Sequence, residues 1–148
     1  DAVSSAGSFL DGGGSRALQR AAIPILEADH VLSETRAISR TFRDKRDYLL
    51  ARLQDIGIRC DLQPEGTFYV WGRLDRLPAP YNDGLGLFRG ALERQVITVP
   101  GHFFDVNPGK RRHEEQTRFR SYTRFSFGPT KDKLEQACDR LAEMVRGQ

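Results

Sequence analysis

Residues 121–127 read Ser-Tyr-Thr-Arg-Phe-Ser-Phe, and the alternation of their side chains predicts a β-strand. Successive side chains of a strand point to opposite faces of the sheet. Phe125 and Phe127 therefore share one face, while Arg124 lies on the other. A helical pattern begins directly after this strand and needs an apolar face to cover. We expect the two phenylalanines to face that helix and Arg124 to face away from it.

Arg124 is the first candidate for a binding residue. A guanidinium held on a rigid strand suits the two-point recognition of a carboxylate or a phosphate. An ordinary exposed arginine produces the same pattern, since most arginines lie at protein surfaces. The strand alone leaves both interpretations open.

Two amphipathic helices are predicted to form the layer that covers the sheet. The first spans residues 25–56 and ends at Gly57, a residue that favours a left-handed helix stop. The second follows Thr130, which suits the first position before a helix. Apolar side chains recur in both at steps of three and four, namely Ile38, Phe42, Leu49, Leu53 and Ile56, then Leu134, Ala137, Cys138, Leu141 and Val145.

Two further strands are expected after the first of these helices. Residues 58–63 alternate between apolar and polar side chains, and residues 67–74 are rich in aromatic and β-branched side chains. A Pro-Glu-Gly turn at 64–66 lies between them. The pattern predicts a hairpin.

A helix over residues 82–94, with Leu85, Phe88 and Leu92 on one side, precedes a short buried strand at 96–99. Together the elements predict an α+β fold, an α/β sandwich with a small and mainly antiparallel sheet. Helices cover one face of that sheet, and a long N-terminal helix leads into it.

The N-terminal residues differ in character from the rest. Residues 2–10 carry no charge, the run of glycines at 12–14 predicts a loop or hinge, and a short helix is expected at 16–23. We divide the chain into an N-terminal segment, 1–24, left from a larger neighbouring domain, and a domain at 25–148. An opening without methionine favours a piece of a longer protein.

The composition is that of an ordinary soluble protein. Its 148 residues carry a net charge of only +3, which gives no argument for a polyanionic partner. No apolar run approaches the length of about eighteen residues needed to span a membrane. Cys60 and Cys138 lie in apolar segments and are interpreted as reduced core residues. We therefore expect a cytoplasmic protein without membrane contact.

Few other residues suggest chemistry. No histidines or cysteines have the spacing of metal ligands, so we expect no metal site. His102 follows a predicted strand, where site residues are common, although an exposed loop histidine is the alternative. The basic run at 110–113 has aromatic neighbours like an RNA-binding surface. Glu114 and Glu115 dilute its charge, so we expect no nucleic-acid partner.

Four segments, in order, resemble the carboxyl-terminal, small-domain part of fold-type I, pyridoxal-phosphate-dependent aminotransferases of class I/II. The first reads Gly-Ser-Phe-Leu-Asp-Gly-Gly at 7–13, together with Leu-Gln-Arg-Ala-Ala at 18–22. The others read Pro-Glu-Gly-Thr-Phe-Tyr-Val-Trp at 64–71, Val-Ile-Thr-Val-Pro-Gly at 96–101 with its continuation to Phe104, and Arg-Phe-Ser-Phe at 124–127. Each segment is a weak signal alone, but their order and spacing are fairly specific.

The resemblance implies that Arg124 binds the α-carboxylate of an amino acid or 2-oxo acid substrate. It also implies that Gly101, His102 and Phe68 line the active site of a longer parent protein, a homodimer with pyridoxal 5'-phosphate as cofactor.

The family's cofactor-binding lysine precedes a Gly-x-Arg-x-Gly stretch, and none of the four lysines here has that context. We therefore expect no catalytic residue and no bound cofactor in this chain alone, which would be an inactive fragment. A non-catalytic protein-interaction module is the alternative.

Overall fold

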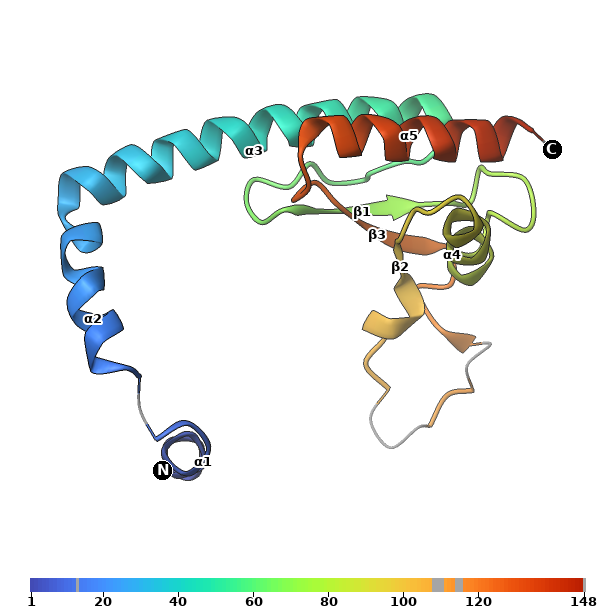
Figure 1. The fold of residues 1–148 in the computed structure, drawn as a ribbon. Helices are drawn as coiled ribbons and strands as arrows, with labels where there is room; N and C mark the ends of the chain where they lie inside the picture. The colour runs from blue at the N-terminus through green and yellow to red at the C-terminus, as the bar shows by residue number, and fades with distance from the viewer. Residues whose placement is uncertain (13, 108–110, 114–115, 148) are drawn as a thin grey trace. The chain divides into compact units, whose positions relative to one another are not determined.

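The computed structural model describes residues 1–12, 14–107, 111–113 and 116–147 (Figure 1). The chain divides into two compact units, residues 1–40 and residues 41–148, and each is described by itself. The boundary between them lies within the long helix α3 (Ala28–Ile56). The predicted division after residue 24 stays a prediction.

Unit 1 contains short helices with little packing between them. They are α1 (Ala2–Asp11), α2 (Arg16–Ala22), the 3-10 helix η1 (Ile23–Leu26) and the first part of α3. The helix α1 was not predicted; Gly12 ends it with a left-handed φ of 58°, at the start of the glycine run for which a loop or hinge was expected. None of the described residues of unit 1 is buried, and Phe9 is 90% exposed. This unit therefore has no apolar core of its own.

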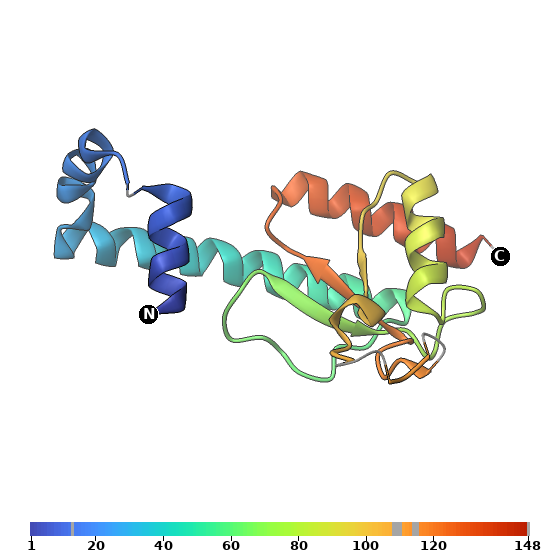
Figure 2. The ribbon, with the colours of Figure 1, turned by 90° about the horizontal axis from the view of Figure 1, so that it is seen from below.

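Unit 2 is built on a three-stranded antiparallel sheet. Its strands are β1 (Tyr69–Arg73), β2 (Val99–Pro100) and β3 (Tyr122–Ser126), in the order β1-β3-β2. The second half of α3 and the helix α5 (Lys131–Arg146) cover one face of the sheet (Figure 1). Figure 2 shows α4 (Gly84–Glu93) beside the segment that leads into β2. The predicted α+β fold is confirmed.

The core of unit 2 lies between the sheet and these two helices. Phe125 and Phe127 are 5% and 1% exposed, and Phe127 packs edge-on against Phe42 of α3 with ring centres 6.0 Å apart. The remaining core side chains come from the two predicted apolar stripes and from β1, among them Leu49, Leu53, Ile56, Val70, Leu134, Cys138 and Leu141. The strand alternation therefore places the phenylalanines as predicted.

The predicted hairpin is wrong. Residues 58–63 form no strand, and only one bridge joins Arg59 to Arg73 of β1. Ile58 reaches the core, but Leu62 is 84% exposed. Because Leu62 is exposed, the end of this segment lacks a buried side chain that would hold it against the sheet, and the pairing stops after one residue pair.

The predicted buried strand at 96–99 is also shorter than expected, since β2 spans only Val99–Pro100 and Ile97 is 78% exposed. Gln95 has a left-handed φ of 60°, which prevents an extended start. Pro100 lacks the N–H group that would continue the ladder. The strand is therefore limited at both ends.

The face that α4 buries differs from the prediction. Leu85 and Leu92 are 39% and 49% exposed, whereas Gly84, Leu87 and Ala91 are buried. A Cβ atom on Gly84 would lie 2.6 Å from the carbonyl oxygen of Tyr122. The small side chains let α4 lie close to the backbone near Tyr122. Side-chain size, rather than apolar character alone, therefore determines which face of α4 is buried.

The two cysteines are free thiols. Cys138 is buried in the core, and the half-buried Cys60 packs against the core. Burial raises the pKa of each thiol to about 11. Both are therefore protonated and unreactive at neutral pH.

Candidate functional site

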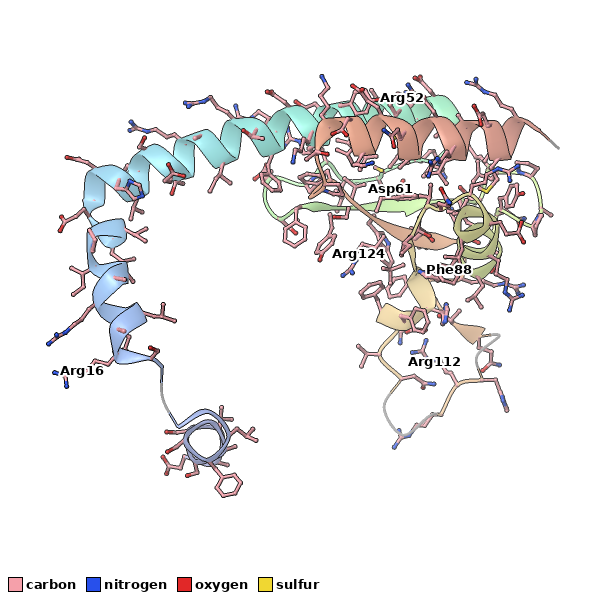
Figure 3. All side chains as sticks on the ribbon, viewed as in Figure 1. Arg16, Arg52, Asp61, Phe88, Arg112 and Arg124 are labelled. Atoms are coloured by element: carbon pink, nitrogen blue, oxygen red, sulfur yellow. The ribbon has the colours of Figure 1, made fainter. Side chains whose placement is uncertain are left out.

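Arg124 lies at the centre of the sheet. In the register of β3 it is paired with Trp71 of β1 on one side and with Val99 of β2 on the other. Figure 3 shows its side chain on the face of the sheet opposite α3 and α5. A pair of neighbouring strands therefore fixes the backbone of this arginine, while its side chain points away from the core.

Two aromatic rings contact the Arg124 guanidinium. Its central carbon, Cζ, lies 4.0 Å from the ring centre of Tyr69 and 4.8 Å from that of Phe104. Tyr69 begins β1, and Phe104 ends the 3-10 helix η2 (Gly101–Phe104). Both contacts are cation–π interactions, in which the ring face attracts the positive charge.

The guanidinium has no anionic partner within the part of the chain that the structure describes. Neither a hydrogen bond nor an ion pair is formed by the Arg124 side chain there. Arginine presents five N–H donors in a fixed planar arrangement. The aromatic rings do not occupy these N–H donors. The donors therefore remain available for a carboxylate from outside the chain.

Further aromatic side chains surround this position. The Trp71 ring contacts Phe104, Phe119 and Tyr122, with centres 5.4, 5.5 and 5.6 Å away, the last of them stacked. We call Tyr69, Trp71, Phe104, Phe119 and Tyr122 the aromatic cluster. Through Tyr69, Phe104 and Trp71 the cluster places aromatic side chains next to Arg124, where a charged contact is stronger than in open water.

A carboxylate anchors the loop that carries two members of the cluster. Asp105 follows Phe104, and its side chain is only 8% exposed. It accepts two hydrogen bonds from the Arg112 guanidinium, both 2.8 Å, one of 3.0 Å from the Thr117 hydroxyl and one of 2.9 Å from the Arg118 backbone N–H. We call these four residues the Asp105 hub. Since Phe119 follows Arg118, the hub connects both aromatic ends of the loop.

The hub predicts an acid-sensitive loop. Hydrogen bonds from Arg112 and from the Arg118 backbone lower the pKa of Asp105 from its ordinary value of 3.8 to about 2. A lowered folded-state pKa stabilises the fold above pH 4, and this contribution is lost as the pH falls from about 4 to about 2. We expect the fluorescence of Trp71, the single tryptophan of the chain, to change within that window.

The matched variant for this measurement is Asp105→Asn, which should show the altered Trp71 emission already at neutral pH and lack the step below pH 4. Other carboxylates titrate in both proteins, so the difference between the two curves isolates Asp105. Superimposable curves would show that the hub does not hold the loop.

The predicted lining residues occupy three different settings. Gly101 is buried where η2 begins, and a Cβ there would lie 2.4 Å from the carbonyl oxygen of Phe119. The centre of the His102 ring lies 4.1 Å from that of the Phe103 ring. Phe68 is 43% exposed, and its ring lies 4.2 Å from that of Tyr69. Phe68 thus approaches Arg124 through Tyr69, and the roles of all three residues stay predictions.

Sequence reasoning missed the contacts of Tyr69 and Phe104 with Arg124. One signal for Tyr69 was present, since it alternates with the buried Val70 and therefore shares the face of Trp71. Phe104 ends a segment that resembles the family, and the resemblance places the loop from Pro100 to Phe104 near the substrate. The contact of Phe104 with Arg124 depends on the direction of η2, which no local pattern predicts.

Nowhere in the described ranges do three or more histidine, cysteine or acidic side chains gather in a way that could hold a metal ion. Among the same residues, no helix has the length and apolar character required to cross a membrane.

The known proteins that resemble this chain include several aminotransferases. The LL-diaminopimelate aminotransferase of Oleidesulfovibrio alaskensis is 33% identical over 136 residues, which cover 91% of this chain and 30% of the relative. The crystal structure of an aminotransferase from Mycobacterium tuberculosis matches 95% of this chain and 33% of its own with a TM-score of 0.72 and 24% identity. The aspartate aminotransferase of Thermus thermophilus with maleate has the same TM-score and coverage at 20% identity.

These matches concern only part of each relative, because the chain spans about a third of the length of the proteins it resembles. The two structural matches show the fold. A family model described as aminotransferase class I and II matches residues 2–141, nearly the whole chain. The chain therefore belongs to the class I and II aminotransferase family.

Proposed function

We propose that this chain is the carboxyl-terminal part of a pyridoxal-phosphate-dependent aminotransferase, in which Arg124 binds the carboxylate of the substrate. The observation that carries the proposal is a guanidinium on the central strand, held by two rings and without an internal anion among the described residues. The sequence resemblance and the family membership support the same role.

The chemistry of Arg124 fits both substrates of amino-group transfer. An amino acid and the 2-oxo acid that it forms share one carboxylate, while the group beside it changes from an amine to a ketone. A two-point arginine contact recognises this constant part. The Thermus thermophilus neighbour was solved with maleate, a dicarboxylate, which supports an anionic ligand of this class.

The surroundings of the described lysines support a cofactor site outside this chain. Lys45 donates a hydrogen bond of 3.1 Å to the Gly128 carbonyl oxygen and lies over Phe42, and Lys131 lies over Tyr48. Both ring contacts involve side chains of α3, and Lys133 lies on α5, so these three lysines belong to the helices that cover the face of the sheet away from Arg124. Lys110 lies outside the described residues. We therefore assign no cofactor-binding residue to this chain and place that group in the rest of a longer parent.

This division of roles can be tested by trapping the cofactor. The 148-residue chain and the full-length protein are each incubated with pyridoxal phosphate, treated with borohydride and mapped by mass spectrometry. We expect one labelled lysine in the full-length protein, outside this chain, together with amino-group transfer to a 2-oxo acid. The isolated chain should show neither.

Two outcomes contradict the proposal. Stoichiometric labelling of a single lysine within the isolated chain would show that it holds the cofactor. A full-length protein without transfer activity on a panel of amino acids would leave Arg124 without the proposed role.

We further propose that the parent is a cytoplasmic homodimer and that unit 1 contributes to its contacts. Unit 1 exposes large apolar side chains and buries none of its described residues. The isolated chain should therefore associate in solution, as measured by light scattering after gel filtration, and Phe9→Ser should reduce this association. A clean monomer at high concentration, with residues 1–10 protected from protease, would contradict the expectation.

A further inference from the structure

We propose that Tyr69 and Phe104 are positioning residues that hold the Arg124 guanidinium ready for a carboxylate. The proposal rests on the role of Arg124 given above and extends it to two residues whose contacts with Arg124 the sequence did not predict. Tyr69, Arg124 and Phe104 are called the aromatic clamp.

The clamp is formed by three separate elements. Tyr69 belongs to β1, Arg124 to β3 and Phe104 to η2, and the ring centres lie 4.0 and 4.8 Å from the Arg124 Cζ. Both distances fall within the range of about 6 Å in which a ring attracts a cation. The guanidinium is thus restrained by contacts that come from two parts of the chain.

Restraint by rings differs from restraint by an acidic side chain. An internal carboxylate would hold the arginine but would also compete with the substrate for its N–H donors. A ring attracts the charge without occupying those donors in this structure. The clamp therefore limits the freedom of a long side chain before the ligand arrives, which lowers the entropy lost on binding.

Each ring is itself held in place. Tyr69 pairs with Ser126 in the sheet, and its ring also contacts Phe68. Phe104 packs edge-on against Trp71 and precedes Asp105, whose carboxylate binds Arg112, Thr117 and the Arg118 backbone. The positions of both rings are thus fixed independently of any ligand.

The test uses steady-state kinetics of the full-length protein with an amino acid and a 2-oxo acid. Tyr69→Leu and Phe104→Leu should each raise KM for both substrates by about three- to tenfold, the range of a cation–π contact, with a smaller change in kcat. Tyr69→Phe and Phe104→Tyr keep a ring and should recover most of the affinity. Phe103→Leu, in the same turn but with a ring that is 69% exposed, serves as the matched control.

A double-mutant cycle separates positioning from a general structural effect. Combined with Arg124→Ala, Tyr69→Leu should raise KM no further, because the guanidinium that it positions is gone. An equal additional loss in that background would overturn the clamp. So would unchanged KM in both leucine variants when Arg124→Ala alone is strongly impaired.

Failure of the Arg124 role and a loss of stability can both be told apart from failure of the clamp. If Arg124→Ala itself leaves KM unchanged, the role of Arg124 fails, and the clamp fails with it. If Tyr69→Leu lowers the melting temperature, its KM no longer reports on positioning alone. The comparison of Phe104→Leu with Phe104→Tyr then tests the clamp, since Phe104 lies outside the strands and the buried core.

Discussion

Replacing Arg124 with lysine should lower kcat/KM of the full-length enzyme by about ten- to a hundredfold. A hydrogen-bonded contact to a charged group contributes about 1.5–3 kcal/mol, and each 1.4 kcal/mol corresponds to a factor of ten. Lysine keeps the positive charge but loses the planar pair of donors that a carboxylate accepts. The loss should appear with every substrate that carries the common carboxylate.

The fold should tolerate this change. The Arg124 side chain lies on the face opposite the core, and it forms no hydrogen bond or ion pair among the described residues. The melting temperature of Arg124→Lys should therefore stay close to that of the natural protein, so that kinetics and stability separate.

Arg52→Lys is the matched control. Arg52 lies on α3, where its guanidinium pairs with Asp139 at 2.7 Å, and Figure 3 shows it on the other side of the sheet. The same substitution there should leave kcat/KM unchanged. If Arg124→Lys also leaves it unchanged, or if its loss follows unfolding, Arg124 is only a surface residue.

Local periodicity accounts for what the sequence predicts well. The alternation around Arg124 and the apolar stripe of α5 depend on neighbours within a few residues, and both are confirmed. Residues 58–63 have a similar alternation and form no strand, because strand formation also needs a partner that holds the segment. Alternation of apolar and polar side chains is therefore not enough to form a strand when neither face is buried.

Contacts distant in sequence account for what the sequence does not predict. Tyr69 and Arg124 meet because of the register between β1 and β3, which pairs Trp71 with Arg124 although the two are distant in the sequence. Phe104 joins them through a turn whose direction depends on Gly101 and on the Asp105 hub. No pattern in a short window encodes these meetings, although each residue involved is visible in the sequence.

Phe127→Ala should have the largest effect on stability, a loss of about 3–5 kcal/mol in the free energy of unfolding. Phe127 is 1% exposed, lies edge-on to Phe42 and sits among the side chains between β3 and the helices. Truncation removes the transfer free energy of the ring and leaves a cavity that a close-packed interior fills only in part. Urea unfolding of the 148-residue chain, followed by Trp71 fluorescence, measures the loss.

Two comparisons make this result specific to burial. Phe127→Leu retains most of the apolar volume and should cost much less, since a smaller cavity remains. Phe103→Ala makes the same truncation at a ring that is 69% exposed and should change the free energy of unfolding by no more than about 0.5 kcal/mol. Equal losses at the two positions would contradict the core described here. In the full-length protein, a folded Phe127→Leu should keep the KM for both substrates, because Phe127 faces the helices while Arg124 lies on the opposite face, where we propose that the carboxylate binds.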